Sequence, residues 1–211
     1  MGTQDTNSSV VDLPPLDVKC NATDCPNGRH CYRQNRKLPE AKRYPDGVCW
    51  DCGTDGVVDW DRVRSFNLED QDYVIEMLRT ELIRFHYWDR VDVHQDHRAI
   101  NYALRKGRID LRDAVMHRLN KYFRVQGFRD GAQTPKVSSK TKQRNIVHYA
   151  QHATATCCRK CMAYWYGIDV SETLTDEQVE YFADLIMRYI DAKLPDLPDN
   201  GTSVSPVHDD K

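Results

Sequence analysis

Residues 175–193 have the sequence TDEQVEYFADLIMRYIDAK, which is the pattern of an amphipathic helix. Thr175 and Gln178 are spaced as a capping box, in which two side chains satisfy free backbone N–H groups at the start of a helix. The apolar side chains recur every three or four residues, so they would share one face and pack against a core. Those on the predicted inner face are Val179, Phe182, Ile186 and Ile190.

The same helical spacing extends upstream of this segment. It predicts a helix that begins at Asn67, a second over residues 97–106 that stops at Gly107, and a third that begins at Asp110. Signals for β-strands are almost absent. We therefore predict a mainly α protein, with a helical domain over residues 61–195 and a small Cys-rich metal module over residues 19–60.

Composition bounds the remaining possibilities. The chain has 211 residues, 40% of them hydrophobic and 29% charged, and its net charge is −2. Its longest uncharged apolar runs fall far short of the roughly 20 residues that a membrane-spanning helix needs. No secretory signal is recognisable, so we expect a cytoplasmic protein without a membrane segment. Polar residues 1–18 and acidic residues 196–211 are expected to form a disordered arm and a disordered tail.

The first cysteine group indicates a structural metal site. The Cys49-x2-Cys52-Gly53 stretch has the form of a knuckle that directs two sulfur atoms at one ion. A second pair must come from Cys20, Cys25 and Cys31, and His30 could also contribute a nitrogen. We favour Cys25, Cys31, Cys49 and Cys52 as zinc ligands, with Cys20 as the next candidate. A set of buried thiols without metal, or an iron–sulfur cluster, is the alternative.

The second group predicts another zinc ion. Cys157, Cys158 and Cys161 follow His152 within nine residues, and these four residues are the predicted ligands. His148 or a water molecule could complete the site. Four protein ligands would make it structural, whereas an open position would suit catalysis. Residues 131–168 contain no Asp or Glu, which disfavours a self-contained deaminase-like site. A buried Cys cluster beside a core His is the alternative.

The stretch QHATATCCRKC at residues 151–161 is also distinctive as a motif. Together with GAQTP at residues 131–135, it resembles an uncharacterised bacterial family of unknown function. The N-terminal cysteines are similar to those of longer actinobacterial members. Many members have His where this chain has Tyr166. The resemblance implies no established activity.

Charge is distributed unevenly along the chain. Residues 98–144 contain 13 Lys and Arg but only three Asp and Glu, whereas residues 169–211 contain 11 acidic and three basic residues. A basic segment attracts phosphate, and the aromatic residues within it could stack on bases, namely Tyr102, Tyr122, Phe123 and Phe128. Tyr122 fits the inner face of its helix, so Phe128 is the better stacking candidate. The predicted nucleic-acid contacts are Arg105, Lys106, Arg108, Arg112, Lys121, Arg124, Arg129, Gln133 and Thr134. The alternative is that the basic helices pair with the protein's own acidic C-terminal helix.

Three functions remain open from these patterns. The first is a zinc protein that contacts DNA or RNA through its basic helices. The second is a metal- or thiol-dependent enzyme centred on His152 and the second cysteine group, with the Gln133-Thr134 loop positioning the substrate. The third is a metal-stabilised module that binds another protein through its acidic helix.

Overall fold

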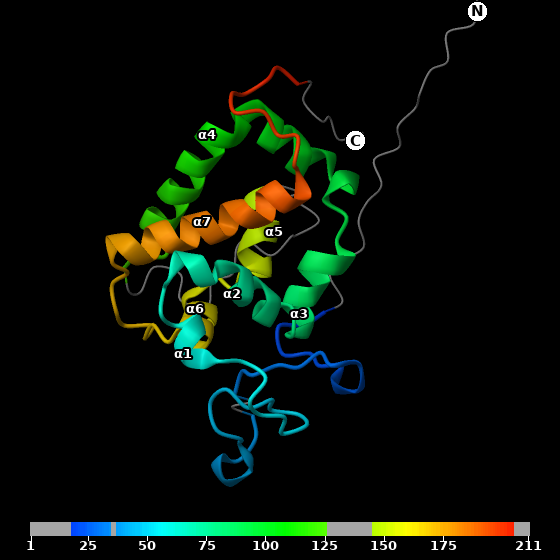
Figure 1. The fold of residues 1–211 in the computed structure, drawn as a ribbon, viewed down its shortest axis with the longest axis vertical. Coiled ribbons are helices and arrows are strands. Elements are labelled where there is room, and N and C mark those ends of the chain that lie inside the picture. The colour runs from blue at the N-terminus through cyan, green and yellow to red at the C-terminus, as the bar shows by residue number, and fades with distance from the viewer. Residues whose placement is uncertain (1–17, 35–36, 126–144, 205–211) are drawn as a thin grey trace, which may run out of the picture.

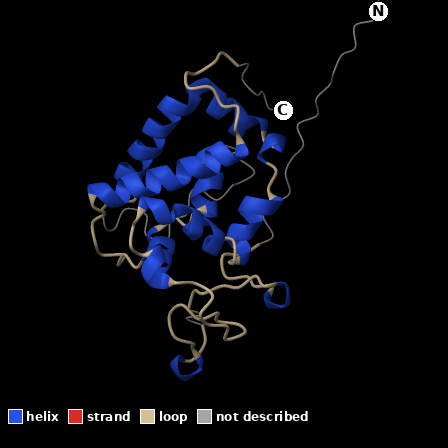
Figure 2. Cartoon of the chain, viewed as in Figure 1, coloured by secondary structure: helices blue, strands red, loops and turns tan. Residues whose placement is uncertain are grey.

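The computed structural model describes residues 18–34, 37–125 and 145–204, and this part of the chain is helical without strands (Figure 2). Two isolated bridges, Asp24–Arg29 and His30–Glu81, are its only β pairings. The α-helices are α1 (Trp60–Val63), α2 (Gln71–Leu78), α3 (Leu82–Phe85), α4 (His97–Tyr122), α5 (Ile146–Ala153), α6 (Arg159–Tyr166) and α7 (Asp176–Lys193). Shorter helical turns are Cys25–Asn27, Glu40–Lys42, Leu68–Asp70, His86–Arg90 and Val93–Gln95. The prediction of a mainly α protein is confirmed. None of these helices is both long and apolar enough to cross a membrane.

Helix α7 lies at the centre of the fold and packs against α4 and α5 (Figure 1). It begins as the sequence predicts, because Thr175 and Gln178 form both hydrogen bonds of a capping box. The four predicted inner side chains are at most 1% exposed. Their burial at helical spacing provides the apolar face on which the other helices assemble.

Helix α4 is two helical segments joined at Gly107, whose φ of 68° and ψ of 175° are not helical. The break leaves backbone groups without partners inside the helix, as at any helix end. The chain after α7 satisfies them: Arg108 N donates to Pro198 O at 2.8 Å, and Thr202 N donates to Leu104 O at 2.7 Å. The sequence predicts a disordered tail over residues 196–211. Pro198 and Thr202, which lie in that range, instead form these backbone hydrogen bonds with α4. Backbone pairing at the break had no side-chain signal in the sequence.

Replacing Gly107 with Ala should destabilise the protein more than a change of glycine conformation alone. Its backbone conformation is open almost only to glycine, which predicts a cost of about 1–3 kcal/mol. In addition, a Cβ there would lie 2.4 Å from the carbonyl carbon of Asn200. Gly56→Ala is the matched control, because Gly56 also has a positive φ (69°) but nothing lies within 4 Å of its Cβ position. Equal losses of unfolding free energy in denaturant titrations would contradict the close approach.

The helix predicted from Asn67 is divided into shorter pieces. Asn67 does cap a helical turn, since its side chain accepts a hydrogen bond from Glu69 N. After α2, however, the backbone of residues 80–82 leaves the helix and forms hydrogen bonds with His30. His30 N donates to Thr80 O at 2.8 Å, and Leu82 N donates to His30 O at 3.0 Å. The N-terminal segment is thereby attached to the helical domain at the start of α3.

Candidate metal centres

The first centre consists of Cys25, His30, Cys49 and Cys52. One donor atom from each residue lies within 4.8 Å of all the others. The sulfur atoms of Cys25 and Cys49 are 3.8 Å apart, and the Cys52 sulfur lies 3.5 Å from His30 Nδ1. Three sulfurs and one imidazole are a donor set that zinc accepts in closed, tetrahedral structural sites. The cluster could therefore hold a metal ion without a further ligand.

Local turns bring these four residues together. Gly53 N donates to Cys49 O at 3.0 Å and Cys49 N donates to Thr54 O at 2.9 Å, which closes the predicted knuckle. The other arm is a turn that begins at Cys25 and ends at Gly28 in the left-handed conformation. The chain that follows this turn places His30 beside Cys52 of the knuckle. The geometry agrees with the sequence interpretation of Cys49-x2-Cys52 as a pair.

Electrostatics prepares Cys52 to bind a cation. Its sulfur lies 3.0 Å from the Thr54 hydroxyl, and this hydrogen bond is the main reason that the pKa of the Cys52 thiol falls to about 6. By contrast, burial and the neighbouring thiols raise the pKa of Cys25 to about 12. A thiolate at Cys52 beside the protonated thiol of Cys25 is a suitable starting state, because an arriving metal ion displaces the thiol proton.

Cys31 and Cys20 lie outside this cluster, although the favoured ligand set included Cys31. His30 takes the fourth position instead. Successive side chains of an extended segment point to opposite sides, so when His30 faces the cluster, Cys31 faces away from it. The Cys31 thiol donates to Cys20 O at 3.7 Å. The sequence could not decide between His30 and Cys31 as a ligand, because spacing alone does not determine which of two adjacent side chains faces the ion.

The second centre contains Cys157, Cys158 and Cys161, whose sulfur atoms also lie within 4.8 Å of one another. Cys157 and Cys161 are 3.5 Å apart. Cys158 precedes the first residue of α6 in an extended conformation, while Cys161 lies one turn inside that helix. The three residues are only 2–8% exposed. This burial favours a closed site over one that admits a substrate.

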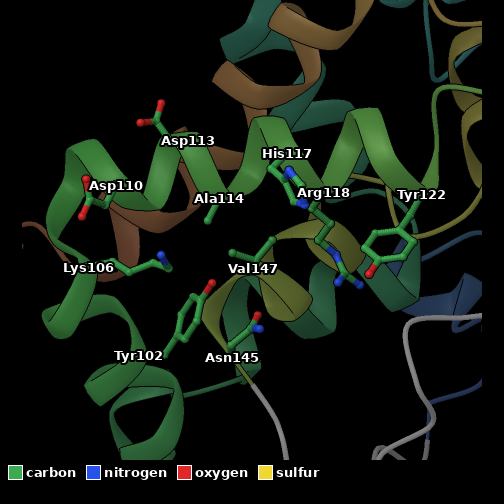
Figure 3. A pocket seen from close by; sticks show the side chains of 10 residues that line it. All are labelled: Tyr102, Lys106, Asp110, Asp113, Ala114, His117, Arg118, Tyr122, Asn145 and Val147. Atoms are coloured by element: carbon green, nitrogen blue, oxygen red, sulfur yellow. The ribbon is translucent and has the colours of Figure 1, made fainter.

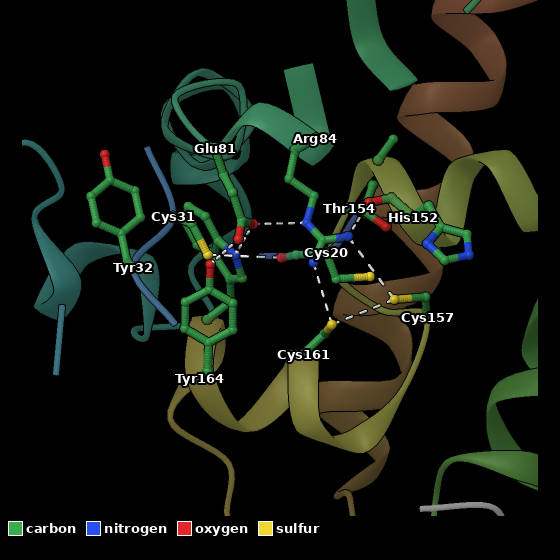
Figure 4. A network of polar contacts seen from close by, with 12 residues as sticks. Cys20, Cys31, Tyr32, Glu81, Arg84, His152, Thr154, Cys157, Cys161 and Tyr164 are labelled. Carbon is green, nitrogen blue, oxygen red and sulfur yellow. Dashed lines mark hydrogen bonds and ion pairs between the residues drawn. The ribbon is translucent and has the colours of Figure 1, made fainter. Parts of the chain in front are cut away.

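A buried charge pair lies beside the sulfurs of Cys157 and Cys161 (Figure 4). The Arg84 guanidinium donates to Cys161 Sγ at 3.3 Å, to the His152 carbonyl at 2.5 Å and to Glu81 Oε2 at 3.0 Å. Glu81 also accepts hydrogen bonds from Trp165 Nε1 at 2.8 Å and from the Tyr164 hydroxyl. Both charged side chains are completely buried. The sequence analysis missed this pair, whose only signal is an i, i+3 charge pair flanking the apolar Leu82 and Ile83.

Arg84 contributes to the ionisation of Cys161. Hydrogen bonds from Cys157 and Cys158, together with the charge of Arg84, hold the pKa of Cys161 well below its ordinary value. Although burial opposes the charged form, Glu81 and the cysteines keep the pKa of Arg84 above its ordinary value. Hydrogen bonds to Cys158 and Cys161, together with burial, instead raise the pKa of Cys157. An arginine that stabilises the Cys161 thiolate in a dry interior is suited to a metal–sulfur centre.

His152 does not join the second centre, contrary to its prediction as a ligand. Its ring stacks on Tyr87, with the centroids 4.9 Å apart and the planes 9° from parallel. Burial, and then the charge of Arg84, lower the pKa of His152 to about 4. The turn after α5, where Ala155 has a φ of 56°, separates this histidine from the cysteines. His148 also lies outside the group.

The predicted nucleic-acid residues divide into three sets. Arg108, Arg112 and Arg124 form ion pairs with acidic residues of α7, at 3.3 Å to Asp191, 2.8 Å to both Glu180 and Asp184, and 2.6 Å to Asp176. Within the described segments, Arg105, Lys106 and Lys121 form no ion pair. Arg129, Gln133 and Thr134 lie outside the described residues. The first set therefore follows the alternative of internal pairing with the acidic helix.

A cavity of 480 Å³ opens between α4 and the start of α5 (Figure 3). It is lined by cationic, aromatic and amide side chains, and also by Asp110 and Asp113. The lining residues relevant to ligand binding are Tyr102, Lys106, His117, Arg118, Tyr122 and Asn145. Lys106 lies 5.8 Å from the ring centre of Tyr102, and Lys121 lies 5.4 Å from that of Tyr122.

The geometry defines a helical domain with a buried cysteine–arginine centre, to which a separate Cys/His cluster is attached. Residues 72–191 match a family described as a domain of unknown function (DUF4186), and the chain belongs to that family. The match contains the second centre, but it begins after the four residues of the first centre, Cys25, His30, Cys49 and Cys52. No solved structure matches the chain.

Proposed function

We propose that this protein is an intracellular zinc protein that binds single-stranded DNA or RNA in the cavity between α4 and α5. Two zinc ions, one in each centre, hold the N-terminal segment and the helical domain in place. The cavity with its aromatic and cationic lining is the observation that carries the nucleic-acid part of the proposal.

Zinc is supported by the chemistry of the donors. Both centres are rich in sulfur, which favours zinc over the oxygen-preferring magnesium and calcium ions. The eight cysteines are free thiols. A reducing cytoplasm would keep them in this state.

Nucleic-acid binding is supported by the tyrosine rings that line the cavity and by the lysine amino groups near them. Bases stack on aromatic side chains, and neighbouring cations neutralise phosphates. Tyr102, Lys106 and Tyr122 line the cavity in Figure 3, and Lys106 lies over the Tyr102 ring. Lys121 is not one of the lining residues, but it lies over the ring of Tyr122. The cavity also offers the Asn145 amide for hydrogen bonds to a base edge. The acidic helix α7 is less suited to docking a protein, because its carboxylates pair with Arg108 and Arg112 of α4 and with Arg124 just after that helix.

A salt titration of the double variant Lys106→Ala/Lys121→Ala tests this assignment. We expect weaker binding to unrelated single-stranded oligonucleotides. The plot of log affinity against log salt should also flatten by about 0.7 for each lost phosphate contact. Fluorescence anisotropy at several salt concentrations measures both quantities.

The matched control is Arg108→Ala/Arg112→Ala, which removes the same charge from residues paired with α7. We expect this control to retain its affinity and to lose at most about 1 kcal/mol of stability per exposed ion pair. If the two double variants bound equally weakly, the loss of affinity would come from net charge and not from the cavity, which would contradict the proposed site. No binding of DNA or RNA by the wild type at low salt would refute the nucleic-acid proposal.

A further inference from the structure

The second centre lacks an evident fourth donor among the residues predicted for it. Three sulfurs surround the site, but tetrahedral zinc in a closed site takes four ligands. The His152 ring is stacked on Tyr87. The Glu81 carboxylate is already engaged by Arg84, Tyr164 and Trp165. A different element must therefore supply the missing ligand if the site is closed.

The N-terminal segment brings one more thiol to this position. Figure 4 shows the Cys20 side chain beside Arg84, directed toward Cys157 and Cys161. Its sulfur is not among the three that all lie within 4.8 Å of one another, so it must move closer when a metal ion binds. Its carbonyl is held by the Cys31 thiol at 3.7 Å, and the next carbonyl, of Asn21, accepts a hydrogen bond from Trp50 Nε1 at 3.1 Å. The backbone at Cys20 is thus fixed by two contacts from the N-terminal module while its side chain faces the helical domain.

We propose that Cys20 is the fourth ligand of a divalent-metal site with Cys157, Cys158 and Cys161. This inference rests on the proposed function only in requiring that the second centre binds metal. The site would join a segment outside the family match to the helices inside it. Metal binding would release the thiol protons to solvent and leave four thiolates around the ion.

Charges around the site favour four thiolates. A divalent ion with four thiolates has a net charge of −2, which would be costly in a dry interior without nearby cations. Arg84 touches the sulfurs from one side. Arg33 is a second cation, since Cys161, Cys158 and Cys20 offset the effect of burial and raise the pKa of its guanidinium.

Cadmium-113 NMR of the full chain tests the ligand count without any substitution. With cadmium in both centres, we expect one resonance from three sulfurs and one nitrogen, and a second, further downfield, from four sulfurs. A second resonance typical of three sulfurs and one oxygen would overturn the assignment of Cys20. A single cadmium, confined to the first centre, would do the same. Absence of metal from both centres would refute the zinc proposal itself, so the two failures are distinguishable.

Substitution then identifies the fourth sulfur. Cys20→Ser should weaken metal binding at the second centre by more than about 100-fold, because even outer-shell changes cost 10–100-fold. The control is Cys31→Ser, which alters a buried thiol of the same segment whose hydrogen bond goes to the Cys20 carbonyl. Competition with a chromophoric chelator measures both affinities. Equal affinities of Cys20→Ser and Cys31→Ser would exclude Cys20 as a ligand.

Discussion

Glu81→Gln should lower the free energy of unfolding by about 3–5 kcal/mol, because it leaves a buried guanidinium without its counter-charge. Glu81 and Arg84 are 0% exposed, and their ion pair is 3.0 Å long. The amide has nearly the same shape as the carboxylate. Its one oxygen can still accept hydrogen bonds from Trp165 and Arg84, while its NH2 group can donate to the Tyr164 hydroxyl. The substitution therefore isolates the charge rather than the packing.

The control for this prediction is Asp89→Asn, which breaks the exposed ion pair with Arg79. That change should cost at most about 1 kcal/mol, since solvent screens the pair. Equilibrium unfolding in guanidinium chloride, with metal present for both variants, compares the two costs. A loss for Glu81→Gln as small as that for Asp89→Asn would show that the interior around Arg84 is well solvated.

Cys52→Ser should cause the other large effect, the loss of one metal ion and of the stability that this ion provides. The side chain of Cys52 is exposed, so packing alone predicts a change within about 0.5 kcal/mol. As a ligand, however, it shares in a binding free energy of about 10–16 kcal/mol for structural zinc, which is also folding free energy. The N-terminal module should then become sensitive to protease, whereas the helical domain should keep its circular dichroism.

Chelation provides the matched control for Cys52→Ser. After metal removal, the wild type and the variant should melt at the same temperature, because an exposed serine differs little from an exposed thiol. Elemental analysis before and after chelation gives the number of ions lost. A variant that retains both ions and the wild-type melting temperature would remove Cys52 from the first centre.

Local patterns in the sequence were sufficient for the helices whose stability depends on one apolar face. The capping box at Thr175 and the buried stripe of α7 follow from nearest-neighbour hydrogen bonds and from the helical repeat. Gly107 was recognisable as a helix stop because only glycine readily adopts its backbone angles. The helix predicted after Asn67 was divided because residues 80–82 bond to His30, a contact between distant parts of the chain.

The sequence by itself determined that this is a helical protein with two groups of cysteines, since helical repeat and cysteine spacing are local properties. Only the tertiary structure decided that His30 and not Cys31 faces the first centre, because the docking of this segment on α3 selects one side of an extended chain. It also placed Arg84 against the second cysteine group and paired Arg108, Arg112 and Arg124 with α7. The uneven charges along the chain raised pairing with the acidic helix as an alternative, but long-range electrostatics depends on which helices become neighbours, and only the fold decides that.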